Sequence, residues 1–316
     1  MIWVTWHRYR VRFLVLAFYV VLLIIAMFIT EHAYEIAKAS SGSCPACSTA
    51  FSNAQDNGTW VSVGLALVPL LVGLVLGAPI VASEFENKTN RLAWSQGMTR
   101  TKWLLRTWSI LAVGAVALTS VLVLFTQWWA THIVTSAGDG GALIQPEQML
   151  ITGVDPIAAA LLALTLGMFV GVIARRYLSP YATSVIAMVA IAIAIQWFAL
   201  PRLASTTFKA TVNGGLPHYP VNAWNVGSGF IRIHSGHHSI SIASAVRYCM
   251  SSHSGPVSKI GANEWGCLAI RNVRQVIFFQ PESHYWILQW REAGIYVVLA
   301  GLFLGLSIWS VRRWSA

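Results

Sequence analysis

The stretch IAAALLALTLGMFVGVIARR, residues 157–176, holds eighteen uncharged residues in a row and then two arginines. At about 1.5 Å per residue, a helix of that length spans roughly 27 Å, close to the ~30 Å hydrocarbon core of a bilayer. Arg175 and Arg176 then mark the point at which the chain leaves the membrane. The stretch therefore predicts a transmembrane helix.

Five further uncharged apolar runs have the same character, and they lie at about 13–29, 61–82, 108–130, 181–200 and 293–311. Hydrophobic residues make up 56% of the chain and charged residues only 10%, which excludes an ordinary soluble domain. The first run follows the basic segment HRYRVR, which would also suit a cleaved signal peptide, but its length and the missing cleavage site favour a retained helix. Because no run contains an ionisable residue, an ion gradient has no obvious group on which to act.

The distribution of charge predicts the orientation. With both termini in the cytoplasm, that side carries twelve Lys and Arg residues against two Glu, while the other side carries nine basic and nine acidic residues. The net charge of +10 is thus a topology signal and an attraction to membrane lipids, and it predicts no nucleic-acid partner. The sequence predicts an all-α integral membrane protein with six transmembrane helices and cytoplasmic N and C termini.

Three parts of the chain follow from this layout. Residues 1–200 are expected to hold the first five helices with a cytoplasmic loop at 83–107, residues 201–292 a small extracellular cap, and residues 293–316 the sixth helix and a cytoplasmic tail. The N-terminal MIWVTWHRYRVRF has aromatic and basic residues at helical spacing and predicts an interfacial helix. The alternative is a frayed charged tail.

All four cysteines fall in segments that this topology places outside, where disulfides persist. Of the three pairings, Cys44–Cys47 with Cys249–Cys267 needs no contact between distant loops. Free thiols, or redox or metal chemistry at the CPAC segment, remain the alternatives. Histidines of the long outer loop lack a Cys or carboxylate ligand pattern, so no metal site is expected.

The loop SEFENKTNRLAWSQGMTRTKW, residues 83–103, concentrates polar chemistry between two apolar runs. Ser83 and Glu86 form a capping box, and the residues after them alternate between an apolar and a charged face at helical spacing. The pattern predicts a short amphipathic helix that presents both kinds of group to a soluble partner. The alternative is a solvated loop helix whose positive charges only set the topology.

The apolar spans are interrupted by a few polar residues and by pairs of glycines. A pathway between two copies of the chain would be lined by the second and fifth spans, whose few polar residues are Ser62, Thr183, Ser184 and Gln196. Glycines four apart allow close helix packing, inside the subunit or at a subunit interface. These pairs are Gly73 with Gly77, Gly167 with Gly171, and Gly301 with Gly305.

The chain lacks the motifs of nucleotide hydrolysis and of common hydrolases. No G-x-x-x-x-G-K-[ST] loop is present to hold phosphates, and neither H-E-x-x-H nor G-x-S-x-G occurs. We therefore expect no enzyme activity and no cofactor in this chain. Energy for transport would have to come from a separate subunit.

The segment SEFENKTNRLAWSQGMTRTKWLLRTW resembles the first cytoplasmic loop of ABC-2 type transporter permeases. The matching residues are Glu84, Glu86, Thr89, Leu92, Ser95, Arg100, Trp103 and Leu104. Lys88 departs from the pattern, because Gly is usual at that position. The N-terminal segment, the fourth span and the closing segment from Gln280 are similar to the actinobacterial branch of the same family.

This resemblance implies a division of labour between subunits. It implies a dimer of six-helix permeases, as a homodimer or a heterodimer, above two copies of an ABC ATP-binding subunit that holds ATP and Mg. The helix of the first cytoplasmic loop would be the coupling helix that docks on this ATPase. Its candidate residues are Glu84, Phe85, Glu86, Lys88, Thr89 and Arg91.

The leading hypothesis is a permease subunit of an exporter in a bacterial plasma membrane. Walls so apolar suit a hydrophobic or amphiphilic drug, lipid or peptide better than a sugar or an ion. Two other classes stay open: a sensor or immunity protein that binds a ligand with its outer loop, and a membrane enzyme with an outer active site.

Overall fold

The computed structural model describes most of the helical part of the chain and a part of the long loop before the last helix. The described residues are 2–40, 45–79, 99–133, 143–174, 179–203, 207–210, 223–232, 239–240 and 273–313. The loop at 83–98, with all six coupling candidates, lies outside these residues. So do Cys44, Cys249 and Cys267, together with the side chain of Cys47, and the two disulfides therefore stay predictions.

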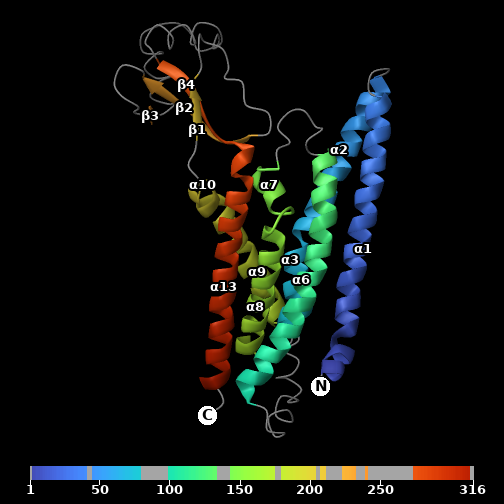
Figure 1. Ribbon diagram of the computed structural model, residues 1–316, viewed down its shortest axis with the longest axis vertical. Coiled ribbons are helices and arrows are strands. Elements are labelled where there is room, and N and C mark those ends of the chain that lie inside the picture. Colours follow the sequence, from blue (N-terminus) through green and yellow to red (C-terminus); the bar gives the residue numbers. More distant parts are fainter. Residues whose placement is uncertain are drawn as a thin grey trace.

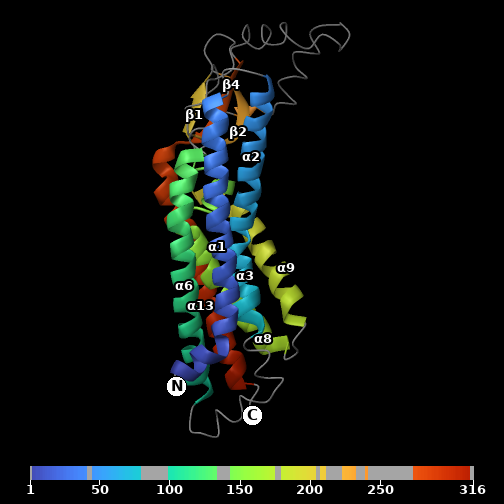
Figure 2. The ribbon, with the colours of Figure 1, turned by 90° about the vertical axis from the view of Figure 1, so that its right-hand side faces the viewer.

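The first half of the chain forms three long helical segments. They are α1 (Ile2–Ser40), then α2 (Pro45–Ala66) continued by α3 (Val68–Val72) and the π-helical turn η1 (Gly73–Gly77), and α6 (Arg100–Ile133). The N-terminal interfacial segment that we predicted is joined to α1 without a break in the helix. Figure 2 shows the first turns of α1 at an angle to the rest of the helix.

The second half begins with the short helix α7 (Pro146–Met149) and ends on the longest helix of that half. The elements between them are α8 (Asp155–Ala174) and α9 (Ser179–Ala194), which continues through the π-helical turn η3 (Ile195–Ala199) into α10 (Leu200–Leu203). The turn η6 (Glu282–His284) precedes α13 (Tyr285–Arg313). Residues 285–313 thus form one continuous helix.

Six helices are long and apolar enough to cross a membrane, which confirms the six predicted spans. They comprise residues 10–39, 56–77, 100–132, 155–173, 181–199 and 282–313. Several extend well beyond the uncharged runs, because a helix continues into the headgroup region as long as its backbone hydrogen bonds are satisfied. Consequently two carboxylates that border the uncharged runs, Asp155 and Glu292, lie within spans. The uncharged runs contain no Asp, Glu, Lys or Arg, as predicted, but the longer spans do near their ends, and among the described acidic residues Asp155 and Glu292 are the buried ones.

The helices form one bundle, with α8 at its centre. Helix α8 packs against α13, α6, α9, α3 and η1. In its most apolar stretch 72% of the residues are buried, compared with 17% to 44% in the other spans. The sequence explains this position, because the apolar residues of α8 surround the whole helix, and a helix that is hydrophobic on every side belongs in an interior.

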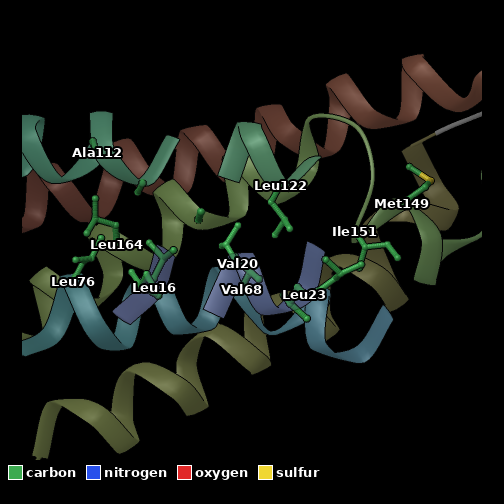
Figure 3. Close-up of a cluster of buried hydrophobic side chains, with 14 of the residues drawn as sticks. Leu16, Val20, Leu23, Val68, Leu76, Ala112, Leu122, Met149, Ile151 and Leu164 are labelled. Atoms are coloured by element: carbon green, nitrogen blue, oxygen red, sulfur yellow. The ribbon is translucent and has the colours of Figure 1, made fainter. Parts of the chain in front are cut away.

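The main apolar core joins α1, α2, α3, η1, α6 and α8. Figure 3 shows its side chains interlocking, with Leu16 and Val20 of α1 against Val68 of α3 and Leu164 of α8. Hydrogen bonds add direction to this packing. Tyr19 of α1 donates to the Gly64 carbonyl of α2 at 3.0 Å, and Trp129 Nε1 of α6 donates to Thr30 Oγ1 of α1 at 3.1 Å.

Glycine allows α8 and η1 to approach within backbone contact. A Cβ atom on Gly73 would lie 2.8 Å from the Ala163 carbonyl oxygen, and one on Gly167 would lie 2.7 Å from the Gly73 carbonyl oxygen. By contrast, a Cβ atom on Gly301 or Gly305 of α13 would meet nothing within 4 Å. The first two glycine pairs thus contribute to packing inside the subunit, whereas the third lies on an open face of α13.

A four-stranded antiparallel sheet forms between α10 and α13 and caps one end of the bundle (Figure 1). Its strands are β1 (Thr207–Ala210), β2 (Trp224–Arg232), β3 (Ser239–Ile240) and β4 (Val273–Gln280), in the order β1-β4-β2-β3. A bulge between Asn225 and Gly227 shifts the register of β2 on β4. We call this end of the bundle the sheet end. The opposite end, where α1 begins and α13 finishes, is the terminal end.

The last strand leads directly into the last helix. Strand β4 ends at Gln280, Pro281 follows, and the His284 amide donates to the Pro281 carbonyl at 3.0 Å. The ring nitrogen Nδ1 of His284 also lies 2.8 Å from Gln280 Oε1. The sheet and α13 thus meet at a short joint that side chains brace.

Candidate functional site

Buried polar side chains, together with the half-buried Gln196, gather where α13 passes the start of α8, at the sheet end of the bundle. We call this group the polar cluster. Its members are Thr152, Asp155, Gln196, Tyr285, Gln289, Glu292 and Tyr296. Asp155, Gln289 and Glu292 are each 0% exposed, which is rare for such residues unless they are paired.

Gln289 uses both ends of its amide to hold the turn between α7 and α8. Its Nε2 donates to the Met149 and Thr152 carbonyls, each at 3.1 Å. Its Oε1 accepts from the Val154 amide at 2.9 Å and the Asp155 amide at 3.1 Å. These two amides belong to the start of α8 and have no partner inside the helix, so Gln289 of α13 acts as the cap of another helix.

The turn between α7 and α8, to which Gln289 is hydrogen-bonded, requires a glycine. Gly153 has φ +69°, a backbone conformation that side chains disfavour. A Cβ atom there would also lie 2.5 Å from Gln289 Oε1 and 2.8 Å from the Tyr285 hydroxyl. Tyr285 completes the contact by donating to Thr152 Oγ1 at 3.0 Å, and Thr152 in turn donates to the Gln148 carbonyl at 2.7 Å.

One turn further along α13, two carboxyl groups meet inside the bundle. Glu292 and Asp155 lie close enough to interact directly. Glu292 Oε1 accepts from Gln196 Nε2 at 3.2 Å and from the Tyr296 hydroxyl at 3.3 Å. Glu292 Oε2 and both Asp155 oxygens accept no well-formed hydrogen bond from the described residues. This pair therefore leaves acceptors unsatisfied in a buried place.

A π-helical turn positions Gln196 for this contact. Residues 195–199 form η3, and Gln196 lies in its first turn while the following Trp197 is exposed. Such a turn holds one residue more than an α-turn, which rotates the side chains that follow it around the helix axis. Three elements, α8, α13 and η3, thus bring polar groups to the same point. π-Helical turns often accompany functional sites.

The four pathway candidates are not equivalent in the structure. Ser62 Oγ donates to the Gly58 carbonyl and Ser184 Oγ to the Tyr181 carbonyl, each at 3.1 Å, so these hydroxyls bond to their own helices. Thr183 is exposed on α9. Gln196 joins the polar cluster, twelve residues beyond Ser184 and therefore about 18 Å further along that helical segment. A role for the four in a substrate pathway stays a prediction.

Sequence reasoning missed the polar cluster because Asp155 and Glu292 border uncharged runs and were assigned to the loops. One signal could have revealed it. Tyr285, Gln289, Glu292 and Tyr296 recur at spacings of four, three and four, which places them on one face of a helix. Polar residues confined to one face of a membrane helix point toward other protein segments rather than toward lipid.

The terminal end shows a different pattern of charge. Among the residues at its helix ends whose side chains the structure describes, none is Asp or Glu and seven are basic. These are Arg10, Arg12, Arg100, Lys102, Arg106, Arg312 and Arg313. Arg312 Nε of α13 donates to Thr101 Oγ1 of α6 at 3.1 Å, so the two helices are joined there. This end has the charge expected beside a cytoplasmic membrane surface.

Comparison with known proteins identifies the helical part. No curated protein and no solved structure matches the chain. A family model described as ABC-2 membrane transporter related matches residues 11–199, from α1 through η3. The matched region contains Asp155 and Gln196, whereas the sheet and α13 lie beyond it. Because the match covers more than half of the chain, the protein belongs to the ABC-2 membrane transporter related family.

Proposed function

We propose that this chain is the membrane-spanning subunit of an ATP-driven exporter. The observation that carries the proposal is the family match across five of the six spans. Members of this family are usually non-catalytic permease subunits, and the family generally implies an ATP-binding partner. The sequence agrees, because it contains no phosphate-binding loop of its own.

In this proposal two copies of the chain stand on two copies of the ATP-binding subunit, which hold ATP and Mg. The terminal end faces the cytoplasm, where its basic residues meet anionic lipid headgroups. The described helical segments on either side of residues 83–98 reach this same end of the bundle, where η1 ends and α6 begins (Figure 1). Glu84, Phe85, Glu86, Lys88, Thr89 and Arg91 would then face the ATPase.

The cargo in this proposal is hydrophobic or amphiphilic: a drug, a lipid or a peptide. The described spans expose many large apolar side chains and, apart from the buried polar cluster, few polar ones. Such a surface solvates an alkyl chain or an aromatic ring at little cost in free energy, but it offers few hydrogen bonds to a sugar. Movement outward is part of this proposal and is supported by the family resemblance alone.

Charge reversal in the coupling loop tests this function. The chain is co-purified with its ATP-binding partner from its native membrane, reconstituted in proteoliposomes, and assayed for ATP hydrolysis stimulated by a panel of hydrophobic compounds. We expect Glu84→Lys with Glu86→Lys to abolish the stimulation, because the reversed charges no longer suit the partner's surface. Glu147→Lys, at an exposed position in α7, serves as the matched control.

Two results would contradict the proposal. One is full stimulation in the doubly reversed chain, and the other is a purified chain that carries no ATP-hydrolysing subunit. Binding of a compound without ATP-dependent accumulation in inverted vesicles would favour a sensor instead. Labelling of Cys249 or Cys267 from the cytosol would overturn the assigned orientation.

A further inference from the structure

Four oxygen atoms inside the polar cluster are buried and have no hydrogen-bond donor among the described residues. They are both carboxyl oxygens of Asp155, Oε2 of Glu292 and Oε1 of Gln196. Asp155 and Glu292 are completely buried by the protein itself. Tyr296 and the Gln196 amide donate to Glu292 Oε1, and the first amides of α8 donate to Gln289. The Ala293 backbone amide approaches Asp155 without forming a well-aligned hydrogen bond.

Nothing described nearby supplies a positive charge. The groups that act electrostatically on the two carboxyls are the carboxyls themselves, the hydroxyls of Tyr285 and Tyr296, and the backbone amide of Ala293, none of which is a cation. The neighbouring arginines are engaged elsewhere: Arg291 of α13 donates to the Leu203 carbonyl, and Arg202 of α10 donates to the Phe198 carbonyl at 3.0 Å. The partial positive charge at the start of α8 would stabilise one carboxylate, but not two in contact.

Two adjacent carboxylates in a dry interior repel each other, and each one also loses its hydration, so the arrangement requires a positive charge. A metal ion needs several ligands and a cavity that fits its coordination shell. Among the described residues, no group of three or more His, Cys, Asp or Glu could hold one. A proton needs no cavity, removes one negative charge, and turns one unsatisfied oxygen into a donor for another.

We propose that Asp155 and Glu292, assisted by Gln196, form a proton-binding site that joins α8 to α13 at the sheet end of the bundle. The proton comes from a hydronium ion in water at the sheet end, which becomes water as the carboxyl O–H bond forms. With the proton bound, one carboxyl donates to the other. Gln196 contributes from η3 through its Nε2, which donates to Glu292 Oε1 at 3.2 Å.

Proton release then depends on separation of the helices. A proton cannot leave a completely buried pair unless water reaches it, and water reaches it only when α13 moves away from α8. After release, the repulsion between two carboxylates opposes closure. Opening of the sheet end and exchange of the proton are therefore linked steps. This inference goes beyond the exporter function, because it concerns a second ligand.

Infrared spectroscopy of the full chain in lipid nanodiscs tests the proposal directly. A protonated carboxyl buried in a protein gives a carbonyl stretching band that shifts in D₂O. We expect this band near neutral pH in the wild type, and we expect its loss in Asp155→Asn and in Glu292→Gln. The exposed Glu147→Gln is the matched control and should retain it.

A second measurement covers the case in which a variant fails to fold. Because the closed state binds a proton that the open or unfolded chain binds more weakly, thermal stability of the wild type should fall as the pH rises. Asp155→Asn and Glu292→Gln should lose this dependence. Tryptophan fluorescence reports the transition.

Several outcomes would overturn the proposal. They are the absence of the band at neutral pH, an unchanged band in both variants, and stabilisation by Na⁺, K⁺ or tetramethylammonium at constant pH without a carboxyl band. In the last case the occupant would be a larger cation. These measurements use the chain without its ATPase, so their failure is distinct from a failure of the exporter function.

Discussion

Helix α8 is held in two different ways along its length. At its first turn, side-chain hydrogen bonds from α13 hold the backbone, and two carboxyl groups are enclosed beside it. Three turns further on, at Gly167, the helix touches η1 backbone to backbone, with no side chain between them. The first contact depends on protonation and on the exclusion of water, whereas the second depends only on shape.

The difference suggests that the sheet end of α8 can separate from α13 while the contact between α8 and η1 stays intact. Polar contacts at the sheet end lose their strength once water competes for the same donors and acceptors. The contact between Gly73 and Gly167 has no such sensitivity, because dispersion forces act equally in the open and closed states. A movement that opens the sheet end can therefore leave α8 and η1 together as a fixed unit.

The largest loss of stability is expected from a substitution of Gln289. Gln289→Leu removes four hydrogen bonds and leaves two amides and two carbonyls of the α7–α8 turn without partners. We expect a loss of about 3 to 5 kcal/mol in the free energy of unfolding, since each buried unpaired group costs roughly 1 to 3 kcal/mol. Val298→Ala, at an exposed position on the same helix, should cost less than about 0.5 kcal/mol. Equal unfolding temperatures of the two variants in nanodiscs would show that the hydrogen bonds of Gln289 contribute nothing to the stability of the fold.

A smaller effect is expected where shape alone holds the helix. Gly167→Ala places a methyl group 2.7 Å from the Gly73 carbonyl oxygen, and backbone on both sides limits relief. We expect a loss of about 2 kcal/mol, within the range for overpacked interiors. Gly301→Ala is the matched control, since nothing lies within 4 Å of the added atom. Thermal unfolding that is the same for both alanine variants would mean that the α8–η1 contact can relax.

The smallest effect is expected at the terminal end, where the contact between α13 and α6 is exposed. Thr101→Val removes the acceptor of the hydrogen bond from Arg312 Nε. We expect a loss of about 0.5 kcal/mol, because water replaces the lost partner. The unfolding midpoint measured in denaturant should hardly move. A loss as large as that of Gln289→Leu would erase the distinction between the two ends.

The bundle could be predicted from sequence because the hydrocarbon core imposes its length on every span. Runs of uncharged residues located all six helices, although several helices extend past the runs. The glycine pairs show where this reasoning stops. Gly73 and Gly301 have the same spacing motif, yet only the first faces a neighbouring helix, and spacing alone does not specify which face of a helix is covered.

The polar cluster was beyond the sequence reasoning for a different reason. Gln289 and Asp155 are far apart in the chain, and their contact exists only because α13 returns beside the start of α8. The sheet has the same origin, since β2 and β4 pair across forty residues of intervening chain. Local patterns predict helices and turns, whereas such long-range pairings depend on how the spans assemble.

The joint between β4 and α13 has a mechanical consequence. Pro281 restricts the backbone at this point, and the contact of His284 with Gln280 links the end of β4 to the start of α13. We therefore expect the strand and the helix to move together. A molecule that tilts the sheet must also rotate α13, and this rotation acts on Glu292 two turns along the helix. A ligand that binds the sheet and changes its orientation would therefore also change the position of Glu292 inside the bundle.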